Sequence, residues 1–336
     1  MKNWLIWDER KQNMQQTSVT GMPLPHEDEE GTPIPVTIPV SLGARTHAVF
    51  TTRLGGISEG AFASLNLGGR AEDSAEAVAS NRASLQRALQ ADLSLVAQVH
   101  GKEVFDADTV VDSWNTSYGF DATGFADSKL RIESDAQVST ACSLALGMFA
   151  ADCLPVLLAD DEAGVIAAAH CGRKGLMAGV LDSAIEAMCK KGAERSRINT
   201  VLGPCICGNC YEVGESIALD FEKRYPQTVT ETRFGGIGID IAEAARIDLA
   251  LAGVANIVDA MPRVTAATQY LREDEELRTI CEVDGEGQSL SNRMRELQNA
   301  MCTLENPLWY SHRRASLAGK SHEGRLLALV YKIDKN

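Results

Sequence analysis

Short apolar runs bounded by polar or turn residues recur along this sequence, and they predict buried β-strands. Three of these runs lead directly into a side chain that can do chemistry. Residues 93–99 precede His100, residues 144–151 precede Asp152 and Cys153, and residues 165–169 precede His170. Because the end of a strand is a rigid position that substrate can still reach, the pattern predicts a site at the rim of a sheet.

Helical spacing of apolar residues alternates with the strands. It predicts helices over residues 73–91, 176–191, 215–224 and 240–252, and further strands over residues 46–52, 198–202 and 326–332. Asp73 with Glu76, and Asp240 with Glu243, have the spacing of capping boxes. This alternation predicts an α/β (α+β) fold with a layered mixed β-sheet core flanked by helices.

The two ends of the pattern differ from the middle. Residues 1–40 are rich in proline and acidic side chains, which predicts an extension that is disordered at least through Gly31, with the globular part beginning near Thr46. Residues 106–134 are weakly patterned and are expected to form a surface loop. Residues 263–300 are charged and irregular, and they predict an insertion that is part helix and part mobile.

Composition excludes some classes of partner. The chain has 336 residues, is 45% hydrophobic and carries a formal net charge of −14, so nucleic acid is not expected as a partner. It contains no apolar run of membrane-spanning length and no secretory signal, which predicts a cytoplasmic protein without a membrane partner. The nine cysteines are therefore expected to be thiols or metal ligands rather than a disulfide framework.

His100, Cys153 and His170 form a candidate three-ligand site. Two imidazoles and a thiolate bind zinc well, and three protein ligands leave a fourth position for water or substrate, as in catalytic zinc sites. The same trio without metal offers a thiolate nucleophile with a histidine base. A buried cysteine used only for packing, and histidines with ordinary hydrogen bonds, remain the simplest alternative.

Two other groups of residues carry possible chemistry. Cys205, Cys207 and Cys210 place three thiols within six residues, which can bind zinc or copper(I). No matching Cys/His cluster lies near them in the sequence, which favours reduced thiols in a glycine-rich turn. Cationic residues at Arg53, at Arg173 and Lys174, and at Arg313 and Arg314 can together hold a small anion such as phosphate.

Taken together, these motifs resemble the laccase-domain family, also called YfiH-like or polyphenol-oxidase-like. The resemblance covers roughly residues 46–332, and the combination of motifs is far more specific than any one motif. The matching segments are Thr52-Arg53-x-Gly55-Gly56, Leu65-Asn66-Leu67-Gly68, Asn81-Arg82, Gln98-Val99-His100-Gly101, Ala151-Asp152-Cys153-x-Pro155, Ala169-His170-x-Gly172, Leu202-Gly203-Pro204, Tyr211-Glu212-Val213-Gly214, Cys302-Thr303, Ser311-x-Arg313-Arg314 and Gly324-Arg325.

The resemblance implies a single α/β domain and a purine nucleoside enzyme. Members of the family are described as cleaving adenosine, inosine or methylthioadenosine with phosphate, and as deaminating adenosine. Carried over to this chain, the family pattern makes His100, Cys153 and His170 the catalytic or metal-binding trio, with zinc as the expected metal and copper as the alternative. It also implies that the substrate and phosphate contact Arg53, Asn66, Lys174 and Arg313.

The sequence departs from the family pattern beside the expected site. Arg173 and Lys174 stand where the family typically has Trp and Arg, and His312 stands where it usually has Tyr. Lysine keeps the positive charge but loses the bidentate fork of arginine, so anion binding or substrate choice is expected to change.

Two further readings stay open at this stage. A copper-dependent phenol oxidase is suggested by the family's older name, but a multicopper site needs about ten histidine ligands, and the chain has six histidines. A single copper held by two histidines and a cysteine is compatible with the trio. The other reading is a non-catalytic, metal-stabilised partner protein whose acidic insertion is a docking surface, for a partner that the sequence does not identify.

Overall fold

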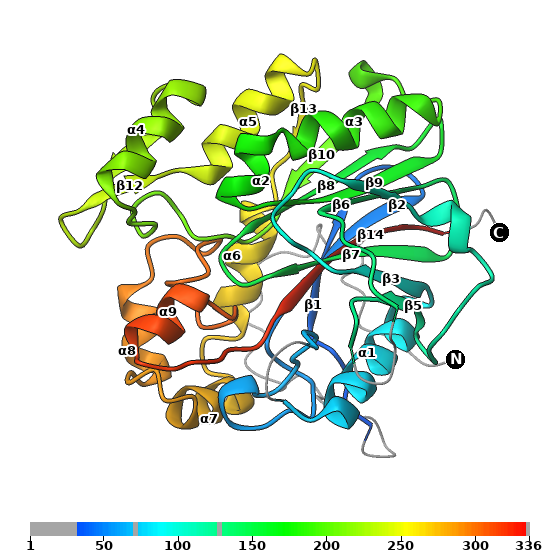
Figure 1. The fold of residues 1–336 in the computed structure, drawn as a ribbon. Coiled ribbons are helices and arrows are strands. Elements are labelled where there is room, and N and C mark those ends of the chain that lie inside the picture. The colour runs from blue at the N-terminus through cyan, green and yellow to red at the C-terminus, as the bar shows by residue number, and fades with distance from the viewer. Residues whose placement is uncertain (1–31, 70–72, 126–129, 334–336) are drawn as a thin grey trace, which may run out of the picture.

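Two β-sheets lie face to face in the centre of the molecule, with helices on their outer faces (Figure 1). The computed structural model describes residues 32–69, 73–125 and 130–333. Within these residues the strands form two six-stranded sheets and one two-stranded sheet. The predicted layered α/β architecture with mixed sheets is confirmed.

The first sheet has the order β1-β2-β14-β7-β3-β5. Its first four strands pair antiparallel, and β7, β3 and β5 pair parallel. The strands of this sheet are β1 (Thr37–Ser41), β2 (Thr46–Thr51), β3 (Asp92–Val96), β5 (Gly119–Ala122), β7 (Leu144–Ala150) and β14 (Leu326–Lys332).

The second sheet has the order β13-β10-β8-β9-β6-β4. Its central strands are antiparallel, and a parallel pair closes each edge. Its strands are β4 (Val104–Asp106), β6 (Ala136–Ser139), β8 (Leu154–Asp160), β9 (Val165–Cys171), β10 (Asn199–Leu202) and β13 (Asn256–Val258), while β11 (Val229–Glu231) and β12 (Ile237–Ile239) form the small third sheet.

Alternation along the strands divides the core into layers. On β9, Ile166 and Ala168 pack in the cluster between the two sheets, whereas Val165, Ala167 and Ala169 pack against the helices outside. Both faces are buried, which explains why these strands appear in the sequence as continuous apolar runs. By the same alternation His170 lies on the face of β9 that looks toward the other sheet.

The helices cover the sheets and build one end of the molecule (Figure 1). Helix α1 packs outside the first sheet, and α2, α3 and α5 pack outside the second. The helices are α1 (Ala75–Leu89), α2 (Arg173–Ala178), α3 (Val180–Lys190), α4 (Glu215–Arg224), α5 (Ile241–Leu251), α6 (Met261–Tyr270), α7 (Glu275–Val283), α8 (Leu290–Glu296) and α9 (His312–Leu317).

The structure corrects several predicted boundaries. The helix predicted over residues 176–191 is two helices, because Gly179 adopts a left-handed conformation (φ 86°) between them. Ser74 caps α1 instead of Asp73, whereas Asp240 caps α5 as predicted. Residues 106–134 are not only a surface loop, since they contain the buried strand β5.

The expected N-terminal extension ends earlier than predicted. Residues 37–41 form β1, which pairs with β2 through five residues of each strand, so they belong to the first sheet. Proline at position 39 is tolerated because β1 is an edge strand, where one side of the strand needs no ladder hydrogen bonds. Residues 1–31, where the disorder was expected, lie outside the described residues.

The helical part expected within residues 263–300 is present, and it packs into the domain. Helices α6, α7 and α8 place Val264, Leu277, Ile280 and Leu290 in the same buried cluster as the strands of both sheets. The charged character that suggested mobility has two sources. The outer helix surfaces are charged, and the turn between α7 and α8 carries buried acidic residues.

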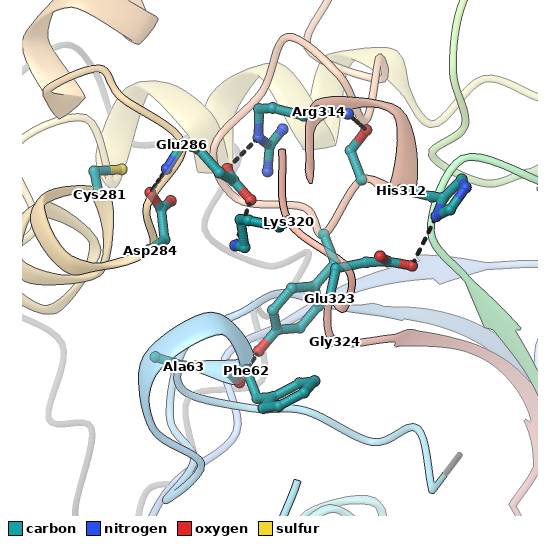
Figure 2. A network of polar contacts seen from close by, with 12 residues as sticks. Phe62, Ala63, Cys281, Asp284, Glu286, His312, Arg314, Lys320, Glu323 and Gly324 are labelled. Atoms are coloured by element: carbon teal, nitrogen blue, oxygen red, sulfur yellow. Dashed lines mark hydrogen bonds and ion pairs between the residues drawn. The ribbon is translucent and has the colours of Figure 1, made fainter. Parts of the chain in front are cut away.

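That turn carries Asp284 and Glu286, which bind buried cations from distant segments. The Nη1 atom of Arg53 lies 3.3 Å from Oδ2 of Asp284 and 3.8 Å from Oε2 of Glu286. We call residues 302–325, which precede β14, the C-terminal segment. Figure 2 shows that Arg314 and Lys320 from this segment reach the same Glu286 carboxylate. Although burial by itself raises the pKa of Glu286, the charges of Arg314 and Arg53 hold it well below its usual range.

The helices that the structure describes include none with the length and low polarity needed to cross a membrane.

Replacing Glu286 by Gln should strongly destabilise the fold. The substitution leaves Arg53, Arg314 and Lys320 without their shared carboxylate, and breaking a buried ion pair costs about 3–5 kcal/mol. Urea unfolding of Glu286→Gln and the wild type measures the loss. Glu275→Gln, which removes an exposed carboxylate at the start of α7, is the matched control and should change stability by less than about 0.5 kcal/mol. Equal stability of all three proteins would contradict this account.

Candidate active site

The structure brings His100, Cys153 and His170 together. His100 lies in the turn that follows β3, Cys153 lies between β7 and β8, and His170 is the last but one residue of β9. One ligand atom from each residue lies within 4.8 Å of the others, and Sγ of Cys153 is 3.7 Å from Nε2 of His100. The three strand ends therefore meet at one point, as the sequence pattern predicted.

Asp135 holds two members of the trio in place. Its buried carboxylate accepts backbone hydrogen bonds from Val99, His100 and Gly101 at 3.1, 2.9 and 2.6 Å. The same carboxylate lies 2.7 Å from Nδ1 of His170. A carboxylate on Nδ1 favours a proton there, and this leaves Nε2 of His170 to face Cys153.

The charges of Cys153 and His170 stabilise each other. Burial raises the pKa of Cys153, but the charge of His170 and a hydrogen bond with His100 outweigh it and lower the pKa to about 6. Burial lowers the pKa of His170, but Cys153 and Asp135 outweigh it and raise the pKa to about 9. A thiolate beside an imidazolium is thus the favoured state of the pair near neutral pH.

The trio has the donors and the space of a metal site. Two nitrogens and one sulfur suit zinc, and an outer carboxylate on a histidine is usual around such ions. Gly172 keeps the site open, since a Cβ there would lie 2.9 Å from Sγ of Cys153 and 3.0 Å from Cδ2 of His100. His100 is exposed while His170 is buried, so one side of the trio faces solvent.

A cavity of about 620 Å³ opens at the trio, a size that suits a small organic ligand. Its wall combines strand ends with residues from the C-terminal segment. The lining residues are Gly68, Gly69, Val96, Ala97, Gln98, His100, Thr123, Phe149, Ala151, Asp152, Cys153, His170, Ile206, Tyr211, Ile241, His312, Arg313, Ser321, His322, Glu323 and Arg325.

Asp152 fastens the C-terminal segment to the site. Its carboxylate accepts hydrogen bonds from Oγ1 of Thr303 and from the backbone N–H of Arg313, both at 2.6 Å. Arg313 in turn donates to the carbonyl of Glu212 and lies 5.5 Å from the centre of the Tyr211 ring. The guanidinium of Arg313 is therefore held at the cavity wall, where an anion can reach it.

Three of the four residues expected to bind substrate or phosphate lie outside the cavity wall in the structure. Arg53 is fully buried among Asp284, Glu286 and the Tyr310 ring, and it lies outside the cavity wall. Asn66 is buried, and its amide hydrogen bonds go to Gly68, Asp73 and Arg325. Lys174 is exposed on α2 and does not line the cavity. Of the four expected residues, Arg313 lines the cavity.

Several residues of the site were not found from the sequence. Glu323 is buried at the cavity wall, where it accepts hydrogen bonds from Nδ1 of His312 at 3.2 Å (Figure 2) and from Arg325. Asp135 carried one usable signal, since a polar pair, Ser134 and Asp135, directly precedes a buried strand. Glu323 stands in a polar stretch where no pattern distinguishes it.

A second group of potential metal ligands lies outside this site. Cys207, Cys210, Cys302 and Glu305 place their ligand atoms within 4.8 Å of one another, and the cluster could hold a metal ion. Cys205, which the sequence grouped with the first two, is not a member.

The fold and site together define an α/β protein with a His/Cys/His centre at the mouth of a cavity. Residues 47–276 match the family model described as "Multi-copper polyphenol oxidoreductase laccase", and the chain belongs to this family.

Sequence relatives carry a different name. The chain is 41% identical over 222 residues, or 65% of its length, to a Streptomyces griseus protein named "Purine nucleoside phosphorylase ORF3", and it covers 83% of that protein. It is 38% identical over 232 residues, 68% of its length and 86% of the relative, to a Corynebacterium glutamicum protein that is also named purine nucleoside phosphorylase.

Solved structures show the same fold. The Neisseria meningitidis protein NMB0706 superposes with a TM-score of 0.64 at 26% identity, covering 89% of this chain and 99% of that one. YfiH from Bacillus licheniformis superposes with a TM-score of 0.63 at 23% identity, covering 86% of this chain and 93% of its own. The expected resemblance to the YfiH-like family is thus confirmed.

Cys153 should be the fast-reacting thiol of the chelator-treated protein. Because its pKa is lowered to about 6, its alkylation by iodoacetamide should reach half its maximal rate near pH 6. Mass spectrometry of tryptic peptides over a pH series measures the rate at each cysteine. Asp135→Asn, which weakens the charge on His170, should move the midpoint upward, with the exposed Cys142 as an internal reference. A midpoint near pH 9 in both proteins would contradict the geometry.

Proposed function

We propose that this chain is a purine nucleoside phosphorylase whose reaction takes place at His100, Cys153 and His170. The observation that carries the proposal is the convergence of this trio at the wall of a 620 Å³ cavity. The relatives' names support it, since they describe purine nucleoside phosphorylases at 38–41% identity. The proposed substrates are adenosine, inosine or methylthioadenosine, together with phosphate.

In the proposed reaction a phosphate oxygen forms a bond to C1′ of the ribose as the bond from C1′ to the purine breaks. The products are the free base, which takes up a proton, and (methylthio)ribose 1-phosphate. Phosphate carries its negative charge to the reacting carbon, so a fixed cation that holds and orients it lowers the barrier. Arg313 fits this role, and Arg325 supplies a second guanidinium on the same wall.

Residues of the trio would also hold a metal ion. The donor set of His100, Cys153 and His170, with Asp135 behind His170, fits zinc, and copper is the alternative. Zinc bound there would supply a positive charge that polarises an oxygen atom of water or substrate. Asp135 would keep the proton on Nδ1 of His170, so that Nε2 stays directed at the centre.

We further propose adenosine deamination at the same site. It is favoured by the exposure of His100, which lets water reach the trio from the cavity. In this reaction water adds at C6 of the adenine ring and ammonia leaves, which yields inosine. Zinc enzymes that deaminate nucleobases also use mixed His and Cys ligands, and this is an analogy of chemistry only.

The structure gives less support to the hypothesis of a copper-dependent phenol oxidase than to phosphorolysis. Of the histidines that the structure describes, only His100 and His170 belong to a group that could hold a metal ion. His47 lies against the Tyr331 ring in a tilted geometry, and His312 binds Glu323. His322 lines the cavity but is not a member of the group. A single copper ion held by two histidines and a cysteine remains the form that the trio allows. Copper-loaded protein that turns blue and oxidises a phenol would favour this function over phosphorolysis.

The products formed from adenosine distinguish the proposed reactions. Chromatography of purified protein incubated with adenosine should show adenine only when phosphate is present. Inosine formed with or without phosphate would establish deamination. Cys153→Ala should lose both products, because it removes the central member of the trio. If neither product forms from adenosine, and inosine and methylthioadenosine also remain uncleaved with phosphate, the proposed function is wrong.

Arg313→Ala should weaken phosphate binding. A charge-assisted hydrogen bond contributes about 1.5–3 kcal/mol, so the KM for phosphate should rise about 10–100-fold while the KM for the nucleoside changes less. Steady-state kinetics at varied phosphate measures this. Lys174→Ala removes a cation that lies outside the cavity wall and serves as the control. A larger effect of Lys174→Ala than of Arg313→Ala would overturn the assignment.

A further inference from the structure

Four potential ligands from two distant segments meet behind the wall of the cavity. Cys207 and Cys210 come from the turn after β10, and Cys302 and Glu305 come from the segment before α9. Oε1 of Glu305 lies 3.3 Å from Sγ of Cys210 and 3.8 Å from Sγ of Cys207. The backbone N–H of Cys207 points at Sγ of Cys302, with 3.5 Å between nitrogen and sulfur.

These separations suit one small tetrahedral ion. With zinc–sulfur bonds of about 2.3 Å, neighbouring donors of a tetrahedron lie about 3.5–4 Å apart. All four ligand atoms here fall within 4.8 Å of one another. Cys210 and Cys302 are fully buried, Glu305 is 9% exposed and Cys207 is partly exposed, so the cluster is more enclosed than the trio, in which His100 is exposed.

The surroundings of Glu305 leave one oxygen for a ligand role. Its Oε2 accepts backbone hydrogen bonds from Gln298 and Asn299 at 2.8 and 2.9 Å, which fixes the carboxylate and directs Oε1 at the thiols. Arg233 lies 3.6 Å from Oε1 and offsets part of the negative charge that three thiolates and a carboxylate would gather. Such outer-shell support is typical of metal sites in proteins.

We propose that Cys207, Cys210, Cys302 and Glu305 form a second, closed metal site that holds a structural zinc ion. Three thiolates select a soft divalent ion, and four protein ligands leave no position for water. The site is separate from the trio and does not depend on the proposed nucleoside reaction.

The zinc ion would join two segments that both build the cavity. The first segment continues from Cys207 and Cys210 to Tyr211, and the second continues from Cys302 to Thr303 and Arg313. Without the ion, an isolated β-bridge of backbone hydrogen bonds at Cys205 and Cys302 still links the two segments. The carboxylate of Asp152 also holds the second segment through Thr303 and Arg313. The ion therefore acts as a cross-link that fixes the cavity wall from behind.

Metal analysis of a chain without the trio tests the proposal directly. The double variant His100→Ala/Cys153→Ala, purified without chelator, should retain about one zinc ion per chain. Adding Cys302→Ser to that variant should remove it. Adding Cys205→Ala instead is the matched control, because Cys205 is a buried cysteine of the same turn that lies outside the cluster.

Cobalt gives a second readout that does not depend on activity. Titration of the chelator-stripped double variant with Co²⁺ should produce the intense absorption of tetrahedral cobalt–thiolate bonds, and one equivalent of Zn²⁺ should abolish it. The Cys302→Ser form should show no such absorption, and its unfolding temperature should no longer rise on adding zinc. A double variant that contains no zinc and takes up no cobalt would overturn the proposal. So would a disulfide between Cys207 and Cys210 in that protein.

Discussion

The Asp135 carboxylate is the contact on which the geometry of the site depends. It gathers three backbone N–H groups of the turn around His100 and the Nδ1 atom of His170. Two strands from different sheets, β3 and β9, therefore end at fixed positions relative to one acidic group. A buried carboxylate with this many donors stays charged, and its pKa is lowered even though burial alone would raise it. Despite burial, the pKa of His170 is raised by the charge of Cys153 and by the Asp135 carboxylate, and the resulting imidazolium in turn lowers the pKa of Cys153.

A second acidic residue, Asp152, holds the C-terminal segment against the site. Asp152 binds Thr303 and the backbone of Arg313, and it directly precedes Cys153. The C-terminal segment is thus tied to the β7–β8 turn, and Arg313 is delivered to the cavity without being near the trio in sequence. The Glu286 carboxylate ties the same segment, through Arg314 and Lys320, to the turn between α7 and α8 (Figure 2).

The cationic residues of the family motifs fall into two groups: some neutralise buried carboxylates in the interior, and others lie at the cavity wall. Arg53 and Arg313 both looked like anion ligands in the sequence, since each stands in a motif of the family. In the structure Arg53 neutralises Asp284 and Glu286 in the interior, whereas Arg313 lies at the cavity wall. A buried guanidinium paired with carboxylates cannot move to a substrate without leaving those charges unpaired, a cost of several kcal/mol.

Local sequence pattern was enough to predict the central strands β2, β3, β7, β9, β10 and β14, the helices α1 and α3 to α5, and the grouping of His100, Cys153 and His170. Continuous apolar runs mark strands that are buried on both faces, and His100, Cys153 and His170 follow such runs closely, so local pattern was sufficient. Which other residues join the trio became visible only from the packing of distant segments. Asp135 reaches His100 and His170 across 35 residues each, and Cys207 meets Cys302 across 95 residues. Glu323 reaches the cavity because the chain before β14 folds against the strand ends. No local periodicity records these contacts. The burial of Asp284 and Glu286 within residues 263–300 could not be recognised from the sequence for the same reason, because their partners Arg53 and Arg314 lie far away in the chain.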